Sequence, residues 1–274
     1  MSAPRIRRFA RNELGRDFVI GDLHGMVELL LAAMDQVGYD PACDRIFSVG
    51  DLIDRGPHSH RAAEVLRIPG FHAVKGNHEC MLLDVVDAFG IESPTVPEIY
   101  VRNGLGWWRD TPITRRREIV DAIRDLPLVM EVETERGSVG FVHAEVPAGM
   151  NWQQFCVEID RGGEAITELA TWSRERVKAG DERGVTGIGR VFVGHTPMSA
   201  GVQRLGNVYY VDTGAVFGAL RGNQGAGLTF ANIVMSTNHL QGTAPAGSLL
   251  NLVDSASTPS TLFGAYAAPV AMTR

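Results

Sequence analysis

The chain has 274 residues, of which 45% are hydrophobic and 21% are charged, and its formal net charge is −6. This composition falls within the range of a globular protein that can bury a sizeable core. The negative charge argues against a surface built to neutralise nucleic-acid phosphates, which needs a basic footprint, so we expect no nucleic-acid partner.

The N-terminal segment, residues 1–16, carries five arginines, but no apolar run follows it. It therefore lacks the pattern of a secretory signal, and we expect a solvated basic arm. No stretch of the sequence is long and apolar enough to span a bilayer, which predicts no membrane partner. The three cysteines share no close spacing. They indicate neither a disulfide framework nor a structural zinc site, and they fit a cytoplasmic location.

Short apolar, β-branched runs recur along the chain, and each ends in Gly, Asp, Asn or His. We interpret the apolar part of each run as a buried strand and the polar part as the loop at its C-terminal end. Apolar residues with helical spacing lie between the first three runs, at 27–34 and 62–66. Strand and helix therefore alternate, which predicts the α/β class. The runs are residues 17–25, 45–56, 71–79, 138–147, 190–197 and 208–214.

Residues 90–126 interrupt this alternation, and we expect two helices with a loop between them. The segment carries Tyr100, Trp107 and Trp108. It is predicted to form a helical cap over one sheet edge, with its aromatic residues packing rather than stacking on a ligand.

The end of the chain is poor in charge, because Asp254 and Arg274 are its only charged residues from His239 onward. This composition predicts an extension that is loosely docked or disordered. The expected organisation is therefore a single domain over residues 1–238, followed by the extension over residues 239–274.

The polar residues at the predicted strand ends should converge, because open α/β sheets bind ligands at the C-terminal ends of their strands. They combine carboxylate, amide and imidazole donors, which suit Mn, Fe or Zn better than Ca or Mg. We expect Glu79 to make hydrogen bonds rather than to bind metal. The collected residues are Asp22, His24, Asp51, Asp54, Arg55, Asn77, His78, Glu79, His143 and His195.

This donor set predicts a dinuclear metal site. Asp22 and His24 can turn toward one ion, whereas the second ion can take Asn77, His143 and His195. Asp51 is the natural bridge, because a carboxylate can give one oxygen to each ion. Two ions held in this way can stabilise an oxygen that attacks a phosphate.

Other polar residues have simpler explanations. A lone histidine is more often a hydrogen-bonded structural residue than a ligand, and His58, His60, His72 and His239 are left outside the site on that ground. Asp212 also follows a predicted strand, but a turn-forming role explains it.

Five short motifs resemble the signature series of the metal-dependent phosphoprotein phosphatases, in the calcineurin-like metallophosphoesterase superfamily. The resemblance is greatest to the compact bacterial and bacteriophage branch, and it spans roughly residues 16–216. It implies a four-layer α/β/β/α sandwich with a dimetal site at the strand ends. The motifs are GDLHG at 21–25, GDLIDRG at 50–56, GNHE at 76–79, VHA at 142–144 and GHTP at 194–197.

The resemblance implies the same metal ligands and adds further roles. His78 is expected to be the general acid, paired with Asp54, and Arg55 is expected to clamp the phosphate. Arg174 resembles the second phosphate-binding arginine of the family, with Arg176 or Arg183 as alternatives.

One departure from the family pattern is Glu145, which stands where many relatives have glycine. Its carboxylate is expected either at the mouth of the site or in a surface turn.

The implied activity is hydrolysis of phosphoserine or phosphothreonine in proteins, with phosphotyrosine also open, by direct attack of a metal-bridging hydroxide. The implied cofactors are two divalent transition-metal ions, with Mn²⁺ expected and Fe or Zn as alternatives. Phosphoproteins or phosphopeptides are the expected partners, and a monomer is favoured. Two other functions remain open: a dinucleoside polyphosphate hydrolase of the same superfamily, and a metal-stabilised binding module without catalysis.

Overall fold

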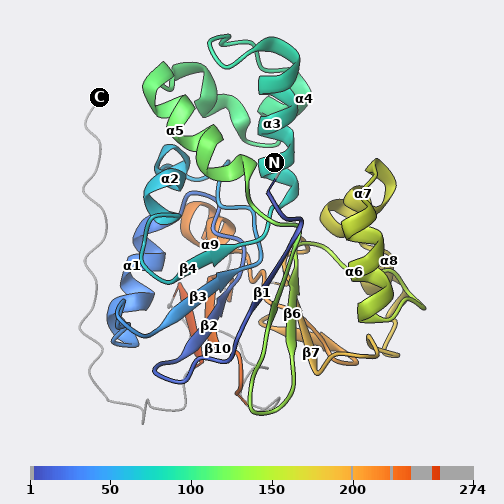
Figure 1. Ribbon diagram of the computed structural model, residues 1–274. Coiled ribbons are helices and arrows are strands. Elements are labelled where there is room, and N and C mark those ends of the chain that lie inside the picture. The colour runs from blue at the N-terminus through green and yellow to red at the C-terminus, as the bar shows by residue number, and fades with distance from the viewer. Residues whose placement is uncertain (1–2, 199, 223–224, 236–248, 254–274) are drawn as a thin grey trace.

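The computed structural model describes residues 3–198, 200–222, 225–235 and 249–253, which form two β-sheets with helices on their outer faces (Figure 1). The six-stranded sheet contains, in spatial order, β1 (Ile6–Phe9), β5 (Val129–Val132), β6 (Val139–Val142), β7 (Arg190–Val193), β9 (Val208–Tyr210) and β8 (Gln203–Leu205). The five-stranded sheet contains β11 (Leu250–Val253), β10 (Leu228–Asn232), β2 (Asp17–Ile20), β3 (Arg45–Ser48) and β4 (Phe71–Ala73).

Both sheets are mixed. In the five-stranded sheet β2, β3 and β4 are parallel, and β10 is antiparallel to β2. In the six-stranded sheet β6, β7 and β9 are parallel. The C-terminal ends of parallel neighbours lie at the same sheet edge. One sheet therefore has the loops after β2, β3 and β4 at the same end of its strands. The other sheet has the loops after β6 and β7 at the same end of its strands.

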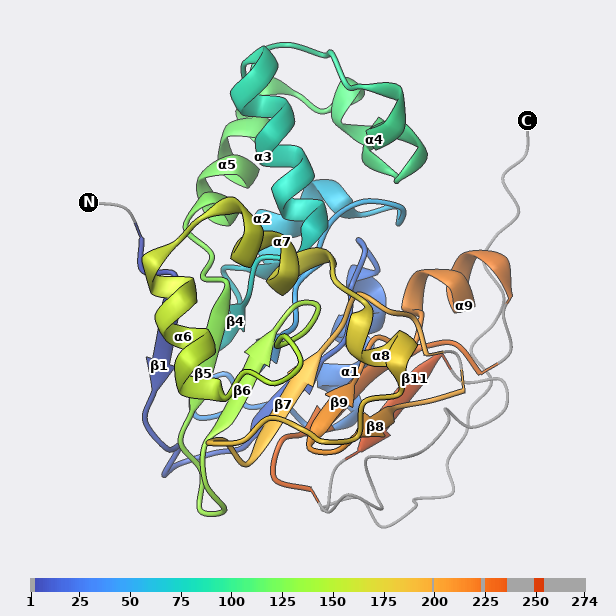
Figure 2. The ribbon, with the colours of Figure 1, turned by 90° about the vertical axis from the view of Figure 1, so that its right-hand side faces the viewer.

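The helices form the two outer layers and a projection at one end (Figures 1 and 2). The six-stranded sheet is covered by α6 (Trp152–Arg161), α7 (Glu164–Trp172) and α8 (Glu175–Ala179). The helices associated with the other sheet are α1 (Val27–Gln36), α2 (Ala62–Val65) and α9 (Ala215–Arg221), with the 3₁₀ helix η1 (Ser59–Arg61) before α2. The projection is built from α3 (Asn77–Phe89), α4 (Glu98–Arg102), η2 (Leu105–Asp110, a 3₁₀ helix) and α5 (Ile113–Arg124).

Side-chain alternation along the strands produces three apolar layers. Phe18 and Ile20 of β2 pack toward the helices of their own side, whereas Val19 between them packs against the opposite sheet. In β6, Phe141 lies between the sheets, and Val142 packs outward with residues of α6. Successive strand residues point to opposite faces, so each sheet is buried on both sides. The predicted four-layer α/β/β/α fold is confirmed.

The six predicted strands and the helices at 27–34 and 62–66 are all present. The solvated basic arm is wrong for residues 6–9, because these residues form β1, which pairs in parallel with β5. Only Ile6 of this strand is fully buried, and Arg7 and Arg8 remain exposed. An edge strand with so little apolar character lacks the alternation by which strands are recognised.

The predicted cap contains α4 and α5, with η2 between them. Trp108 is fully buried in the core beneath it. Most of the predicted C-terminal extension, residues 239–274, lies outside the described residues, but residues 250–253 within it form β11 and pair with β10. No helix within the described ranges is long and apolar enough to cross a membrane.

Candidate metal centre

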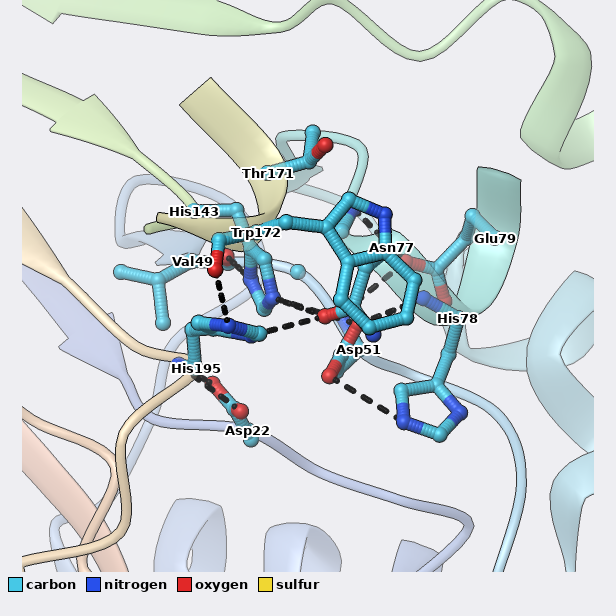
Figure 3. Close-up of polar contacts among 12 residues, drawn as sticks. Asp22, Val49, Asp51, Asn77, His78, Glu79, His143, Thr171, Trp172 and His195 are labelled. Carbon is cyan, nitrogen blue, oxygen red and sulfur yellow. Dashed lines mark hydrogen bonds and ion pairs between the residues drawn. The ribbon is translucent and has the colours of Figure 1, made fainter. Parts of the chain in front are cut away.

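The loops after β2, β3, β4, β6 and β7 bring the predicted ligands together, and Figure 3 labels Asp22, Asp51, Asn77, His143 and His195 among them. Backbone conformation singles out these loops. Among the described residues, every non-glycine residue with positive φ is a predicted site residue. Such conformations cost free energy and concentrate at functional sites. They are His24 (44°), Asp51 (50°), Asp54 (72°), Arg55 (67°) and His195 (65°).

One group of donors surrounds the side-chain oxygen of Asn77. Its Oδ1 lies 2.8 Å from Nε2 of His143 and 2.8 Å from Nδ1 of His195. Oδ1 of Asp51 is 3.4 Å from the same His143 nitrogen. All four side chains are buried. The structure therefore brings together the whole ligand set predicted for one of the two ions.

The outer nitrogens of these imidazoles are held by backbone carbonyls. Nδ1 of His143 donates to the Val49 carbonyl at 2.7 Å, and Nε2 of His195 donates to the Trp172 carbonyl at 3.0 Å. In a neutral ring the inner nitrogens then carry lone pairs, and both face an amide oxygen that is also an acceptor. A cation among these atoms removes their mutual repulsion. The donor set thus fits a metal ion.

A second group of donors lies on the other side of Asp51. Its Oδ2 is 3.7 Å from Nε2 of His24 and 3.8 Å from Nε2 of His78. Nδ1 of His24 lies 2.9 Å from the Ile53 carbonyl, so its Nε2 carries the inward lone pair. His24, Asp51 and His78 are close enough to hold one ion. The two groups share Asp51, as the predicted bridging role requires.

Asp22 lies beside these donors, but it is held by a backbone group. Its carboxylate accepts a hydrogen bond from the His195 backbone N–H, and the distance from that nitrogen to Oδ2 of Asp22 is 3.0 Å. The pKa of Asp22 is raised by burial and by the negative charges of Asp212 and Asp51. Excess negative charge buried here is a second feature that favours a cation.

The electrostatic environment keeps three imidazoles neutral and Asp51 charged. Burial lowers the pKa of His24 and of His143, and it lowers that of His195 to about 3. Neutral imidazole is the metal-binding form. Burial raises the pKa of Asp51, but attraction to these rings whenever one of them holds a proton, His143 first, outweighs the effect of burial and brings the pKa below its ordinary value.

His78 and Asp54 form a buried pair next to these donors. Nδ1 of His78 lies 2.6 Å from Oδ2 of Asp54. Burial lowers the pKa of His78, but Asp51 and the hydrogen bond to Asp54 raise it above its usual value overall. Its Nε2 faces Asp51. His78 thus differs from the other imidazoles of the site, because its environment favours the protonated ring.

Of the predicted arginines, Arg55 and Arg174 lie at the site. Arg55 is exposed, and its Nη1 donates at 2.5 Å to Nε2 of His24, whose lone pair a metal ion would take, so ion binding requires the guanidinium to move off this nitrogen. Arg174 donates to the His195 carbonyl at 3.2 Å. The alternatives are occupied elsewhere, because Arg176 is buried and, like Arg183, bonded to Asp181.

Glu79 and Glu145 stabilise loops near the site. Glu79 accepts from the backbone N–H groups of Asp51, Leu52 and Gly76 at 2.8–3.0 Å, which confirms the expected hydrogen bonds. Gly76 must lack a side chain, because a Cβ there would lie 2.2 Å from Oδ1 of Asp51.

Neither expectation for Glu145 is correct. It is buried and accepts from Ser173 Oγ at 2.5 Å and from the Arg176 backbone N–H at 2.9 Å. It therefore holds the start of α8 instead of facing a substrate.

Two residues of the site were not predicted. Trp107 donates from Nε1 to Oδ1 of Asp54 at 2.7 Å, so its role exceeds packing. Asp212 accepts from the Gly214 N–H, as a turn former does, but it is also buried beside Asp22, and burial raises its pKa to about 6. The position of Asp212 after a strand was a usable signal, whereas nothing in the sequence links Trp107 to Asp54.

Comparisons with known proteins show what this chain is similar to. Residues 18–217 match the family described as Calcineurin-like phosphoesterase. Serine/threonine-protein phosphatase 1 of Salmonella typhimurium is 32% identical over 206 residues, which cover 73% of this chain and 87% of that protein. The symmetrical bis(5'-nucleosyl)-tetraphosphatase of Methylococcus capsulatus is 30% identical over 175 residues, or 58% of this chain and 61% of that protein. A solved structure titled as a putative diadenosine tetraphosphatase aligns with a TM-score of 0.58 at 20% identity, covering 84% of this chain and 94% of that one.

Proposed function

The chain belongs to the calcineurin-like phosphoesterase family, and from this membership we propose that it is a phosphomonoesterase that hydrolyses phosphoserine and phosphothreonine in proteins. One observation carries the proposal. A shared carboxylate, Asp51, lies between two groups of metal donors, and 3.8 Å from it is the imidazole of a buried Asp–His pair. Metal donors, an acid and guanidinium groups, here the exposed Arg55 and the half-buried Arg174, are the parts that phosphate-ester hydrolysis needs.

The two groups of donors fit a pair of divalent ions when Asp22 takes the place of His78, whose environment favours the protonated ring. We assign Asp22, His24 and Asp51 to one ion and Asp51, Asn77, His143 and His195 to the other, with Mn²⁺ as the expected metal and Fe or Zn as the alternatives. When bound, such ions supply positive charge that lowers the pKa of a coordinated water and neutralises charge on a phosphoryl group.

In this proposal, His78 is the general acid, and it gives the proton on Nε2 to the departing alkoxide. Asp54 holds the opposite nitrogen of the ring at 2.6 Å, which fixes the tautomer and stabilises the imidazolium. The raised pKa of His78 suits a group that must carry this proton near neutral pH.

Arg55 and Arg174 are proposed to bind the phosphoryl oxygens. Each guanidinium is planar and offers paired N–H donors, a geometry that matches two oxygens of one phosphate. Arg55 already lies against His24, so a phosphate bound to it would be adjacent to the metal donors. Arg174 reaches the site from the segment between α7 and α8, on the opposite sheet.

Hydrolysis of dinucleoside polyphosphates is the second candidate, because a tetraphosphatase and a putative diadenosine tetraphosphatase structure are among the similar proteins. The wider coverage of the serine/threonine phosphatase favours the protein substrate.

We also propose a cytoplasmic location, which the three free cysteines of the described chain support.

Parallel assays test this choice. The full chain, supplied with Mn²⁺, is given a phosphoserine peptide and diadenosine tetraphosphate at equal concentrations. We expect faster phosphate release from the peptide. A higher kcat/KM for the dinucleotide would establish the second candidate, and hydrolysis of neither compound would support a binding module instead.

A further inference from the structure

The cap reaches the proposed proton donor through one indole group. Nε1 of Trp107 donates to Oδ1 of Asp54 at 2.7 Å, and the other oxygen of Asp54 lies 2.6 Å from Nδ1 of His78. The three residues come from η2, the loop after β3 and the first turn of α3. Asp54 is completely buried, so its carboxylate has no solvent to replace a lost partner.

The chemistry of the indole defines the state of this carboxylate. An indole N–H can only donate, so Oδ1 of Asp54 must be an acceptor. Burial raises the pKa of Asp54 above its usual value overall, and the hydrogen bonds from His78 and Trp107 act in the opposite direction. Trp107 therefore favours the ionised carboxylate and fixes its rotation, which leaves Oδ2 directed at His78.

The cap backbone also contacts the turn that carries Asp54. The Arg55 N–H points to the Gly104 carbonyl at 3.4 Å, and a Cβ on Gly104 would lie 2.6 Å from that nitrogen. Gly104 itself has φ +112°, which favours glycine. The cap loop thus packs closely on Asp54 and Arg55, both of which have positive φ.

We propose that Trp107 is a positioning residue that acts on His78 through Asp54, an inference that rests on the proposed function. By orienting the Asp54 carboxylate, the indole keeps the His78 ring in the geometry needed to protonate a leaving group. Acid catalysis in this protein then depends on the cap as well as on the sandwich.

Trp108 provides a matched control within the same 3₁₀ helix. It is fully buried, and its Nε1 has no hydrogen-bond partner among the described residues. The Arg116 guanidinium lies over its ring at 5.0 Å from the centroid. Replacement of Trp108 by phenylalanine disturbs the packing of the cap, but it removes no hydrogen bond to Asp54.

The first test compares Trp107→Phe with Trp108→Phe on phenyl phosphate and para-nitrophenyl phosphate. Phenolate is the poorer leaving group and needs the proton more. Loss of one hydrogen bond to a charged group predicts that Trp107→Phe lowers kcat for phenyl phosphate by roughly 10-fold and for the nitrophenyl ester by less than about 2-fold. KM should change little. Trp108→Phe should change kcat for both substrates by the same factor.

Two further measurements separate positioning from general damage to the fold. In a double-mutant cycle, Trp107→Phe should have no additional effect in the Asp54→Asn background, because its action passes through that carboxylate. In ¹H–¹⁵N spectra, the indole N–H resonance of Trp107, assigned by its loss in Trp107→Phe, should shift in Asp54→Asn.

The inference would be overturned, with the proposed function left intact, if Trp107→Phe lowered kcat equally for both aryl phosphates. An indole resonance of Trp107 that does not shift in Asp54→Asn would overturn it in the same way. Failure of the wild-type protein to hydrolyse either compound with Mn²⁺ would overturn the proposed function, and the inference with it. The two failures are therefore distinguishable.

Discussion

Nε2 of His78 lies 3.8 Å from Oδ2 of Asp51, with both side chains buried. This distance places the protonatable ring beside the carboxylate that joins the two groups of donors. A phosphate bound to metal ions at Asp51 would have its ester oxygen within reach of His78. The relationship links ion binding, phosphate binding and proton transfer at one point, and each can be tested separately.

Asp51→Asn tests the bridge. An amide has one oxygen and no negative charge, so it holds two cations poorly. We expect fewer than two ions per chain and loss of activity, measured by elemental analysis and phosphate release. Asp87→Asn removes an exposed carboxylate paired with Arg124, and it should retain metal and turnover. Two retained ions with normal turnover in Asp51→Asn would refute the bridging role.

Arg55→Lys tests the phosphate clamp. Lysine keeps the charge but loses the planar pair of donors. We expect a higher KM and weaker inhibition by inorganic phosphate, with metal content unchanged. Arg174→Lys should show the same pattern, whereas Arg183→Lys, which affects only an ion pair with Asp181, should not. Unaltered phosphate inhibition in Arg55→Lys would move the clamp to another residue.

His78→Asn tests the proton donor. The variant should bind both ions, because we assign no metal to His78, and it should turn over roughly 10²–10⁴-fold more slowly. A phosphoserine peptide should lose more activity than para-nitrophenyl phosphate, whose leaving group departs without a proton. Asp54→Asn should show a milder form of this selectivity. If the variant binds only one ion, His78 is a ligand of the group formed with His24 and Asp51.

Glu79→Gln tests the support of the metal loops. Glu79 is fully buried, and its two oxygens accept from three backbone N–H groups. Glutamine would present an NH₂ group to at least one of these donors. We expect a loss of about 1–3 kcal/mol in the free energy of unfolding, measured by denaturant titration, and weaker metal binding. Unchanged stability and metal affinity would contradict this role.

The local sequence pattern was sufficient to predict site residues where a strand leads directly into its polar loop. Asn77, His143 and His195 could be predicted to share one donor group because each follows a recognisable buried run, although β4 lies in one sheet and β6 and β7 lie in the other. Trp107 could not be predicted, because its contact with Asp54 joins segments 53 residues apart and depends on how the cap folds. The prediction for Glu145 was wrong for a similar reason, since the hydrogen-bond partners of Glu145 lie on a distant segment at the start of α8.

Two of the strands that escaped prediction, β1 and β8, have weak local signals, whereas β5 (VMEV) and β10 (LTFAN) also escaped although most or all of their side chains are buried. In β1 two exposed arginines follow a single buried isoleucine, so only its pairing with β5 makes it a strand. β8 is three residues long, with no fully buried side chain. Tertiary pairing overrides local propensity in such segments.

The most direct test of the dimetal phosphoesterase is a titration of Mn²⁺ into chelator-treated protein, with bound metal and hydrolysis of para-nitrophenyl phosphate followed together. The two donor groups that share Asp51 predict no turnover in the metal-free chain and full turnover only as the second ion binds. Hydrolysis by the metal-free protein, or full activity with a single ion bound, would contradict the account.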